Sequence, residues 1–207
     1  MSNLVETEVK LYVPDLDSVI IRLNAAGAVM TKARVYEHNI RYEDTNETLT
    51  GRGIVLRLRQ DAKVRLTYKE PQTQQIEGVL TRFEAEVTVD QFDMMDLILK
   101  RLGYHPHVVY EKYRTTYEFG GAEIVLDEMP YGNFIEVEGP AEEIEAALQV
   151  LNLEREPRIL TGYMVLFGLV KAALNLDVQD LTFANFKGVV VPPEIFHQNA
   201  QGDRQNR

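Results

Sequence analysis

Apolar and polar side chains alternate at period two along several short segments of this chain. In the segment 6–10, Glu6, Glu8 and Lys10 share one face of an extended strand and Val9 points to the other. The same alternation recurs at 56–59, 65–69, 83–87, 112–114, 123–127 and 134–138. These segments are rich in β-branched or aromatic residues, as half-buried strands are. The pattern therefore predicts a sheet with one apolar and one charged face.

Four segments have the boundaries of helices. Asp15 to Ala26 ends at Gly27, and Gln91 to Leu102 follows Asp90, a candidate N-cap residue. The other two predicted helices are Ala141 to Leu151 and Gly162 to Leu174. The last is the most apolar, and we expect it to pack against the body of the protein.

A strand with the pattern Glu-x-Glu, followed by a helix, occurs twice, at Glu6 and at Glu84. Each unit continues through three further predicted strands, at 34–42, 54–59 and 64–69 and then at 108–119, 122–128 and 134–137. Two β-α-β-β-β halves avoid unpaired edges by closing on each other. We therefore predict an α+β fold, an eight-stranded antiparallel closed β-barrel with helices packed outside. Residues 1–187 would form this single domain, and 188–207 a flexible C-terminal tail.

The charged face of the sheet has two interpretations. In an ordinary antiparallel sheet it would face water. In a closed barrel of about eight strands it would line a cavity wide enough for one small ligand. Such a cavity is costly unless its charges pair with each other, with metals or with a charged ligand. Periodicity alone does not decide, although the basic pairs Arg57 with Arg59 and Lys112 with Arg114 favour the cavity.

Composition narrows the classes of partner. The 207 residues carry a formal net charge of −10, which argues against nucleic acid but leaves room for a compact anionic ligand at a local basic site. The absence of cysteine excludes disulfides, thiol nucleophiles and thiolate metal sites. No leader-like or membrane-spanning stretch is evident, so we expect a cytoplasmic protein without a membrane partner.

The predicted inward face carries both signs of charge. Its cations are Lys10, Arg57, Arg59, Lys69 and Arg114, and its carboxylates are Glu6, Glu8, Asp127, Glu136 and Glu138. So many cations suit a densely anionic ligand, and arginine binds phosphate oxygens through two N–H groups. The carboxylates would repel that ligand unless a divalent metal lay between them, as Mg²⁺ or Mn²⁺ commonly does. The pattern indicates a site for a polyphosphate and its metal.

The order of these motifs is more specific than any one of them. It runs from Glu-x-Glu-x-Lys at 6–10 through Leu-Arg-Leu-Arg at 56–59, Thr-Tyr-Lys at 67–69 and Glu-Ala-Glu at 84–86 to Leu-Asp-Glu at 126–128 and Phe-Ile-Glu-Val-Glu at 134–138. The series resembles the CYTH superfamily, or triphosphate tunnel metalloenzymes, over roughly residues 3 to 175. That superfamily includes class IV adenylyl cyclases, thiamine triphosphatases and inorganic triphosphatases.

The resemblance implies a tunnel that binds a linear triphosphate and a divalent metal, Mg²⁺ or Mn²⁺. It implies that phosphate is contacted by Lys10, Arg57, Arg59, Lys69 and Arg114, with Lys112 as a further candidate. Metal would be held or oriented by Glu6, Glu8, Asp127, Glu136 and Glu138. Glu84 and Glu86 would either join the metal shell or order the basic side chains. Lys10, Glu136 and Glu138 are the expected catalytic residues.

The leading functional hypothesis is a metal-dependent hydrolase of a linear triphosphate, either inorganic triphosphate, a nucleoside triphosphate or thiamine triphosphate. The alternatives are a class IV adenylyl cyclase and a non-catalytic polyphosphate- or nucleotide-binding module. The expected partner is a small-molecule triphosphate, and the protein would be a monomer or homodimer. His105-Pro106-His107 is interpreted as a turn because of its proline and its position after Gly103. Two histidines without further ligands are poor evidence for a zinc site.

Overall fold

The computed structural model of this chain describes residues 5–72 and 80–197, except for the side chains of Val5, Glu6, Leu80 and His197. Its main strands are β1 (Val5–Tyr12), β2 (Val29–Glu43), β3 (Val55–Gln60), β4 (Val64–Pro71), β5 (Leu80–Val89), β6 (His105–Phe119), β7 (Ala122–Met129) and β8 (Gly132–Glu138). A short ninth strand, β9 (Arg158–Ile159), pairs with β1. The helices are α1 (Leu16–Ala25), α2 (Thr48–Gly51), α3 (Phe92–Arg101), α4 (Ala141–Val150), α5 (Tyr163–Leu174) and α6 (Glu194–His197).

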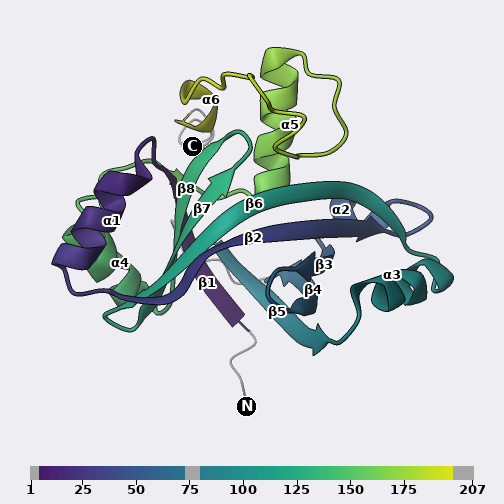
Figure 1. Cartoon of the computed structure of the whole chain (residues 1–207), viewed down its shortest axis with the longest axis horizontal. Coiled ribbons are helices and arrows are strands. Elements are labelled where there is room, and N and C mark those ends of the chain that lie inside the picture. Colours follow the sequence, from purple (N-terminus) through teal and green to yellow (C-terminus); the bar gives the residue numbers. More distant parts are fainter. Residues whose placement is uncertain (1–4, 73–79, 198–207) are drawn as a thin grey trace, which may run out of the picture.

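The strands form an antiparallel ring. Their order is β5-β4-β3-β2-β6-β7-β8-β1, and β1 pairs again with β5 through the register Val5↔Phe83 to Glu8↔Leu80. The two halves of the chain occupy equivalent places in this ring. If β1, β2, β3 and β4 are exchanged with β5, β6, β7 and β8 respectively, the same pairs of strands remain neighbours. The predicted eight antiparallel strands and the two β-α-β-β-β halves are therefore confirmed (Figure 1).

Three helices cover the apolar outer face of the ring. Helices α1 and α4 pack Leu23 and Leu148 against Leu11 of β1 and its neighbours on β7 and β8. Helix α3 packs Leu99 against the β2–β3 side of the ring. Burying each such side chain contributes about 1.5–3 kcal/mol. This packing turns the charged face of the strands inward.

The helix starts differ in how they are capped. Asp15, predicted as the first residue of this helix, is instead the N-cap of α1, since its Oδ1 accepts from the amides of Asp17 at 3.0 Å and Ser18 at 3.3 Å. The predicted cap at Asp90 is wrong. Gln91 takes the N-cap position of α3 in an extended conformation, and its side chain makes no capping hydrogen bond. Asp90 therefore precedes the position from which a side chain reaches the first free amides.

The C-terminal helices α5 and α6 lie on one side of the ring (Figure 1). Phe196 of α6 is fully buried, with its ring centroid 4.9 Å from Tyr12 and 5.2 Å from Phe134. Residues 188–197, which the sequence analysis assigned to a flexible tail, thus include a packed aromatic anchor. Residues 198–207 lie outside the described part of the chain. In the described part, every helix is too short or too polar to cross a membrane.

Candidate active site inside the strand ring

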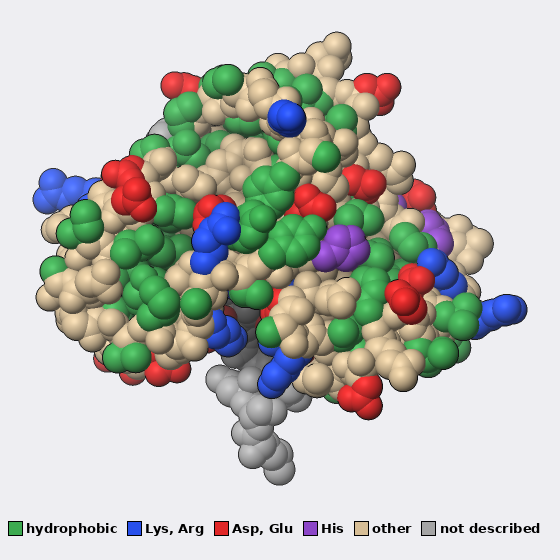
Figure 2. Space-filling model, in the orientation of Figure 1, with side chains coloured by type: hydrophobic (Ala, Val, Ile, Leu, Met, Phe, Trp, Pro, Cys, Tyr) green, Lys and Arg blue, Asp and Glu red, His purple; other side chains and the backbone are tan. Residues whose placement is uncertain are grey.

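The inward faces of the strands line a cavity of about 830 Å³. Figure 2 shows lysine and arginine side chains beside a hollow near the centre of one face of the protein. All six predicted phosphate-binding side chains line the cavity: Lys10, Arg57, Arg59, Lys69, Lys112 and Arg114. So do five of the predicted acidic ones: Glu8, Glu84, Glu86, Glu136 and Glu138. The side chain of Glu6 lies outside the described residues, and Asp127 is not on the cavity wall.

Strands β3 and β4 build a basic wall, because alternate residues of both strands point inward. Arg59 lies directly opposite Arg65 in the β3–β4 register. Glu86 of β5 holds this wall together, since its carboxylate lies 3.1 Å from Arg59, 3.5 Å from Arg65 and 3.7 Å from Arg57. Glu84 likewise lies 2.8 Å from Lys69. Of the two roles expected for these glutamates, the contacts favour ordering the basic side chains.

Two hydroxyl groups hold the guanidinium of Arg57 in this wall. It donates to the Thr67 hydroxyl at 3.1 Å and to the Tyr110 hydroxyl at 3.2 Å. Burial would lower the pKa of Arg57, but Tyr110, Glu37 and Glu86 outweigh it and raise that pKa. For Arg59, burial and the charge of Arg57 lower the pKa. The close packing of like charges is an electrostatic cost that a bound polyanion would relieve.

Strands β1, β8 and β7 build an acidic wall. Glu138 lies opposite Glu8 in the β1–β8 register and opposite Glu123 in the β7–β8 register, and all three line the cavity. Like charges on directly opposite residues destabilise a sheet. An all-oxygen ligand set of this kind suits Mg²⁺ or Mn²⁺. The residues present therefore fit the metal that the resemblance implies, and Glu123 is a candidate ligand that the sequence analysis did not select.

Glu136 connects the acidic wall to two cations. One carboxylate oxygen lies 3.0 Å from Lys10 Nζ and the other lies 2.6 Å from an Arg114 nitrogen. Burial would raise the pKa of Glu136, but Lys10, Arg114 and Lys112 together hold it well below its ordinary value. Burial would lower the pKa of Lys10, but the negative charges of Glu136 and Glu8 outweigh burial and raise that pKa. Glu136 and Lys10 are therefore ionised at neutral pH.

Asp127 lies behind the cavity wall and is fully buried. It accepts from Lys112 at 2.9 Å, from Arg114 at 2.6 Å and from the Tyr163 hydroxyl at 2.8 Å. Asp127 was expected to hold or orient metal. Its placement instead suits the orientation of the two cations, because both carboxylate oxygens already bind them and its side chain does not reach the cavity.

Several cavity residues were missed from the sequence. Glu37 is 2% exposed and lies 3.5 Å from both Arg59 and Lys112. Burial would raise its pKa, but the surrounding cations lower it to about 2. The period-two alternation along β2 is the sequence feature that could have predicted that Glu37 faces the cavity. Further residues without a predicted role that reach the cavity include Lys32, Arg41, Arg65, Arg82, Tyr163 and Lys171.

This chain is similar to known proteins in sequence and in fold. A candidate adenylate cyclase from Methanocaldococcus jannaschii is 26% identical over 178 residues, which cover 80% of this chain and 100% of that relative. A candidate adenylate cyclase structure from Vibrio parahaemolyticus has a TM-score of 0.71 at 19% identity and covers 81% of this chain and 99% of its own.

A candidate adenylyl cyclase from Hippeastrum, described as having a dominant triphosphatase activity, has a TM-score of 0.60 at 20% identity. It covers 79% of this chain and 95% of its own. These solved structures share the fold. Residues 4–163 match the CYTH domain, which is most of the chain. The predicted relationship is confirmed, and this chain belongs to the CYTH family.

Proposed function

We propose that this protein is a metal-dependent hydrolase of a linear triphosphate and that the strand ring works as a closed tunnel around the substrate. The observation that carries the proposal is the separation of charge within one cavity. The basic residues of β3 and β4 form one wall, and the carboxylates of β1, β7 and β8 form another. A chain of phosphates bound by the first wall can share a metal ion with the second.

Each wall has a distinct task. Arg57, Arg59 and Lys69 bind the phosphate oxygens and neutralise their charge, which is most of what phosphoryl transfer requires of a protein. Glu8 and Glu138 would hold Mg²⁺ or Mn²⁺. When bound, such an ion neutralises phosphate charge and lowers the pKa of an attached water. The Glu136 carboxylate keeps Lys10 charged and directed into the cavity.

The reaction is the attack of water on the terminal phosphorus. A new P–O bond forms with the water oxygen, and the bond to the bridging oxygen breaks, which releases orthophosphate and leaves the chain one phosphate shorter. The water proton passes to a carboxylate of the acidic wall. Lys10 and Arg114 neutralise the charge that develops on the leaving oxygen.

Adenylyl cyclase activity is the second candidate, because the cavity also has an apolar part. Met164, Val165 and Phe167 of α5 line it together with the charged strands. This surface offers a place for a purine ring. In this reaction the ribose 3′-hydroxyl takes the place of water, and pyrophosphate leaves.

Product identity tests the proposal. The purified chain is incubated with tripolyphosphate, ATP or thiamine triphosphate and with Mg²⁺ or Mn²⁺, and orthophosphate, pyrophosphate and cyclic AMP are measured. We expect orthophosphate, a loss of turnover of at least about tenfold in Glu138→Gln, and no loss in the matched surface variant Glu156→Gln. Formation of cyclic AMP and pyrophosphate alone supports the cyclase. No turnover of any substrate contradicts both activities.

A further inference from the structure

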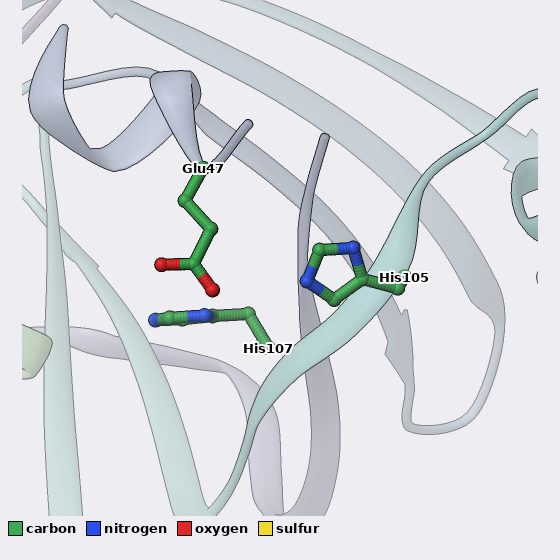
Figure 3. Close-up of side chains that lie close together, drawn as sticks. All are labelled: Glu47, His105 and His107. Atoms are coloured by element: carbon green, nitrogen blue, oxygen red, sulfur yellow. The ribbon is translucent and has the colours of Figure 1, made fainter. Parts of the chain in front are cut away.

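A second set of metal-ligating side chains lies at the start of β6. Among the described residues, Glu47, His105 and His107 each offer a ligand atom, and these three atoms lie within 4.8 Å of one another (Figure 3). The sequence interpretation of His105-Pro106-His107 as a turn is wrong, since β6 begins at His105. Alternate residues of a strand share a face, so the two imidazoles lie on the same side. Glu47 supplies the third ligand, which the sequence did not reveal.

The turn that carries Glu47 is held against β6. The Asp44 carboxylate accepts from the amides of Asn46 at 2.9 Å and Thr48 at 3.0 Å. The Thr45 hydroxyl donates to the carbonyl of Gly103, just before β6, at 3.4 Å. Glu47 itself has φ of 54°, a conformation that costs free energy in a residue other than glycine. These contacts place the Glu47 carboxylate beside the two imidazoles, as Figure 3 shows.

We propose that Glu47, His105 and His107 bind a divalent transition metal, with Zn²⁺ as the best match. Two imidazole nitrogens and one carboxylate oxygen, with water in the fourth position, form a tetrahedral Zn²⁺ ligand set. Metal–ligand bonds of about 2.0–2.1 Å require ligand atoms about 3.3 Å apart. The three ligand atoms now lie within 4.8 Å of one another, so they need to move closer together to bind a metal. The histidines are half-buried and Glu47 is exposed, so small side-chain rotations can bring the atoms to the shorter spacing.

The ligand chemistry separates this site from the acidic wall of the cavity. The acidic wall offers only oxygen ligands, which Mg²⁺ and Mn²⁺ prefer, whereas imidazole favours zinc and its neighbours in the transition series. His107 also lines the central cavity, as do Thr50 and Gly53 from the segment that follows Glu47. A bound ion would therefore tie residues 44–53 to β6 at an edge of the cavity. The assignment does not depend on the proposed hydrolysis.

Metal titration of the whole chain tests the site. In the Glu138→Gln background, which weakens the acidic wall, the protein is dialysed against Zn²⁺ in excess Mg²⁺, and retained zinc is measured by mass spectrometry. Co²⁺ is then titrated as a spectroscopic probe of tetrahedral nitrogen and oxygen ligation. We expect one Zn²⁺ per chain, visible d–d absorption with Co²⁺, and loss of that absorption when Zn²⁺ is added.

Variants assign the ligands. His105→Ala and His107→Ala should each lower Zn²⁺ affinity at least tenfold, Glu47→Gln should also weaken it, and the control His38→Gln should not. Circular dichroism confirms that each variant is folded, and His105→Gln provides a milder change at the same position. Zinc retained equally by the His105→Ala/His107→Ala double variant, or not retained by the parent protein, would overturn the proposal. Loss of zinc in the histidine variants supports this site even if no triphosphate is hydrolysed.

Discussion

Replacing Glu136 by glutamine tests whether this carboxylate holds two buried cations in place. Glu136 is 8% exposed and lies 3.0 Å from Lys10 and 2.6 Å from Arg114. Glutamine keeps the shape and one acceptor oxygen but removes the charge. Lys10 retains Glu8 at 3.7 Å, and Arg114 retains its bonds to Asp127. Neither cation is therefore left wholly unpaired.

The magnitude follows from these remaining contacts. A hydrogen bond to a charged group contributes about 1.5–3 kcal/mol, and removing one partner of a buried ion pair costs about 3–5 kcal/mol when the other charge is left alone. Because the amide keeps one bond and each cation keeps a second carboxylate, we expect a loss of about 2 kcal/mol at pH 7. In a chain of this length that corresponds to a fall in Tm of about 4–8 °C.

The pH dependence has a defined sign. The pKa of Glu136 in the folded protein lies well below its ordinary value of 4.5, because Lys10, Arg114 and Lys112 outweigh the effect of burial. Its ionised form stabilises the fold fully above the unfolded pKa, and this contribution is lost as the pH falls through the folded pKa. The difference in unfolding free energy between wild type and Glu136→Gln should therefore be constant near neutrality and shrink in acid.

Urea unfolding followed by far-ultraviolet circular dichroism, at pH 7 and at a series of lower pH values, measures this difference. The matched control is Glu128→Gln, which breaks a partly exposed pair with Arg34 at 2.7 Å and should cost less than about 1 kcal/mol. The reasoning is refuted if the two variants are equally stable at pH 7, or if the cost of Glu136→Gln stays unchanged as the pH falls.

Two further changes probe the tertiary contacts around the cavity. Glu37→Gln should lower stability at neutral pH by up to about 3 kcal/mol, because the pKa of Glu37 falls from 4.5 to about 2 on folding. Its stabilisation is lost between those pH values, and a variant as stable as wild type at pH 7 in thermal unfolding would contradict this. Phe196→Ala should cost about 3–5 kcal/mol, since the ring is fully buried against Tyr12 and Phe134. An unchanged Tm would show that α6 does not anchor this end of the chain.

Period-two alternation predicted which side chains share a face because it depends only on local backbone geometry. In β8, for example, Glu136 faces the cavity and the neighbouring Val137 enters the outer core. The two Glu-x-Glu units likewise indicated a duplicated fold, since each half repeats the same order of strand and helix. Local patterns of this kind were sufficient for the strands, the main helices and eleven of the charged side chains that line the cavity.

The roles of individual acids were harder to predict because their partners lie on other strands. Asp127 and Glu136 both alternate inward along neighbouring strands, yet Asp127 is sealed behind Lys112 and Arg114 while Glu136 remains on the cavity wall. Glu37 received no role because nothing near it in sequence shows that Arg59 and Lys112 converge on it.

The sequence by itself determined that charged and apolar residues separate onto two faces of a repeated sheet, and its ordered motifs indicated the CYTH family. Only the tertiary structure decided that β1 meets β5, so that the charged face encloses a cavity rather than facing water. It also brought Glu47, in the turn that follows β2, close to His105 and His107 at the start of β6. The physical reason is that strand periodicity is a local property of the backbone, whereas strand register and ring closure bring distant residues to within interaction distance.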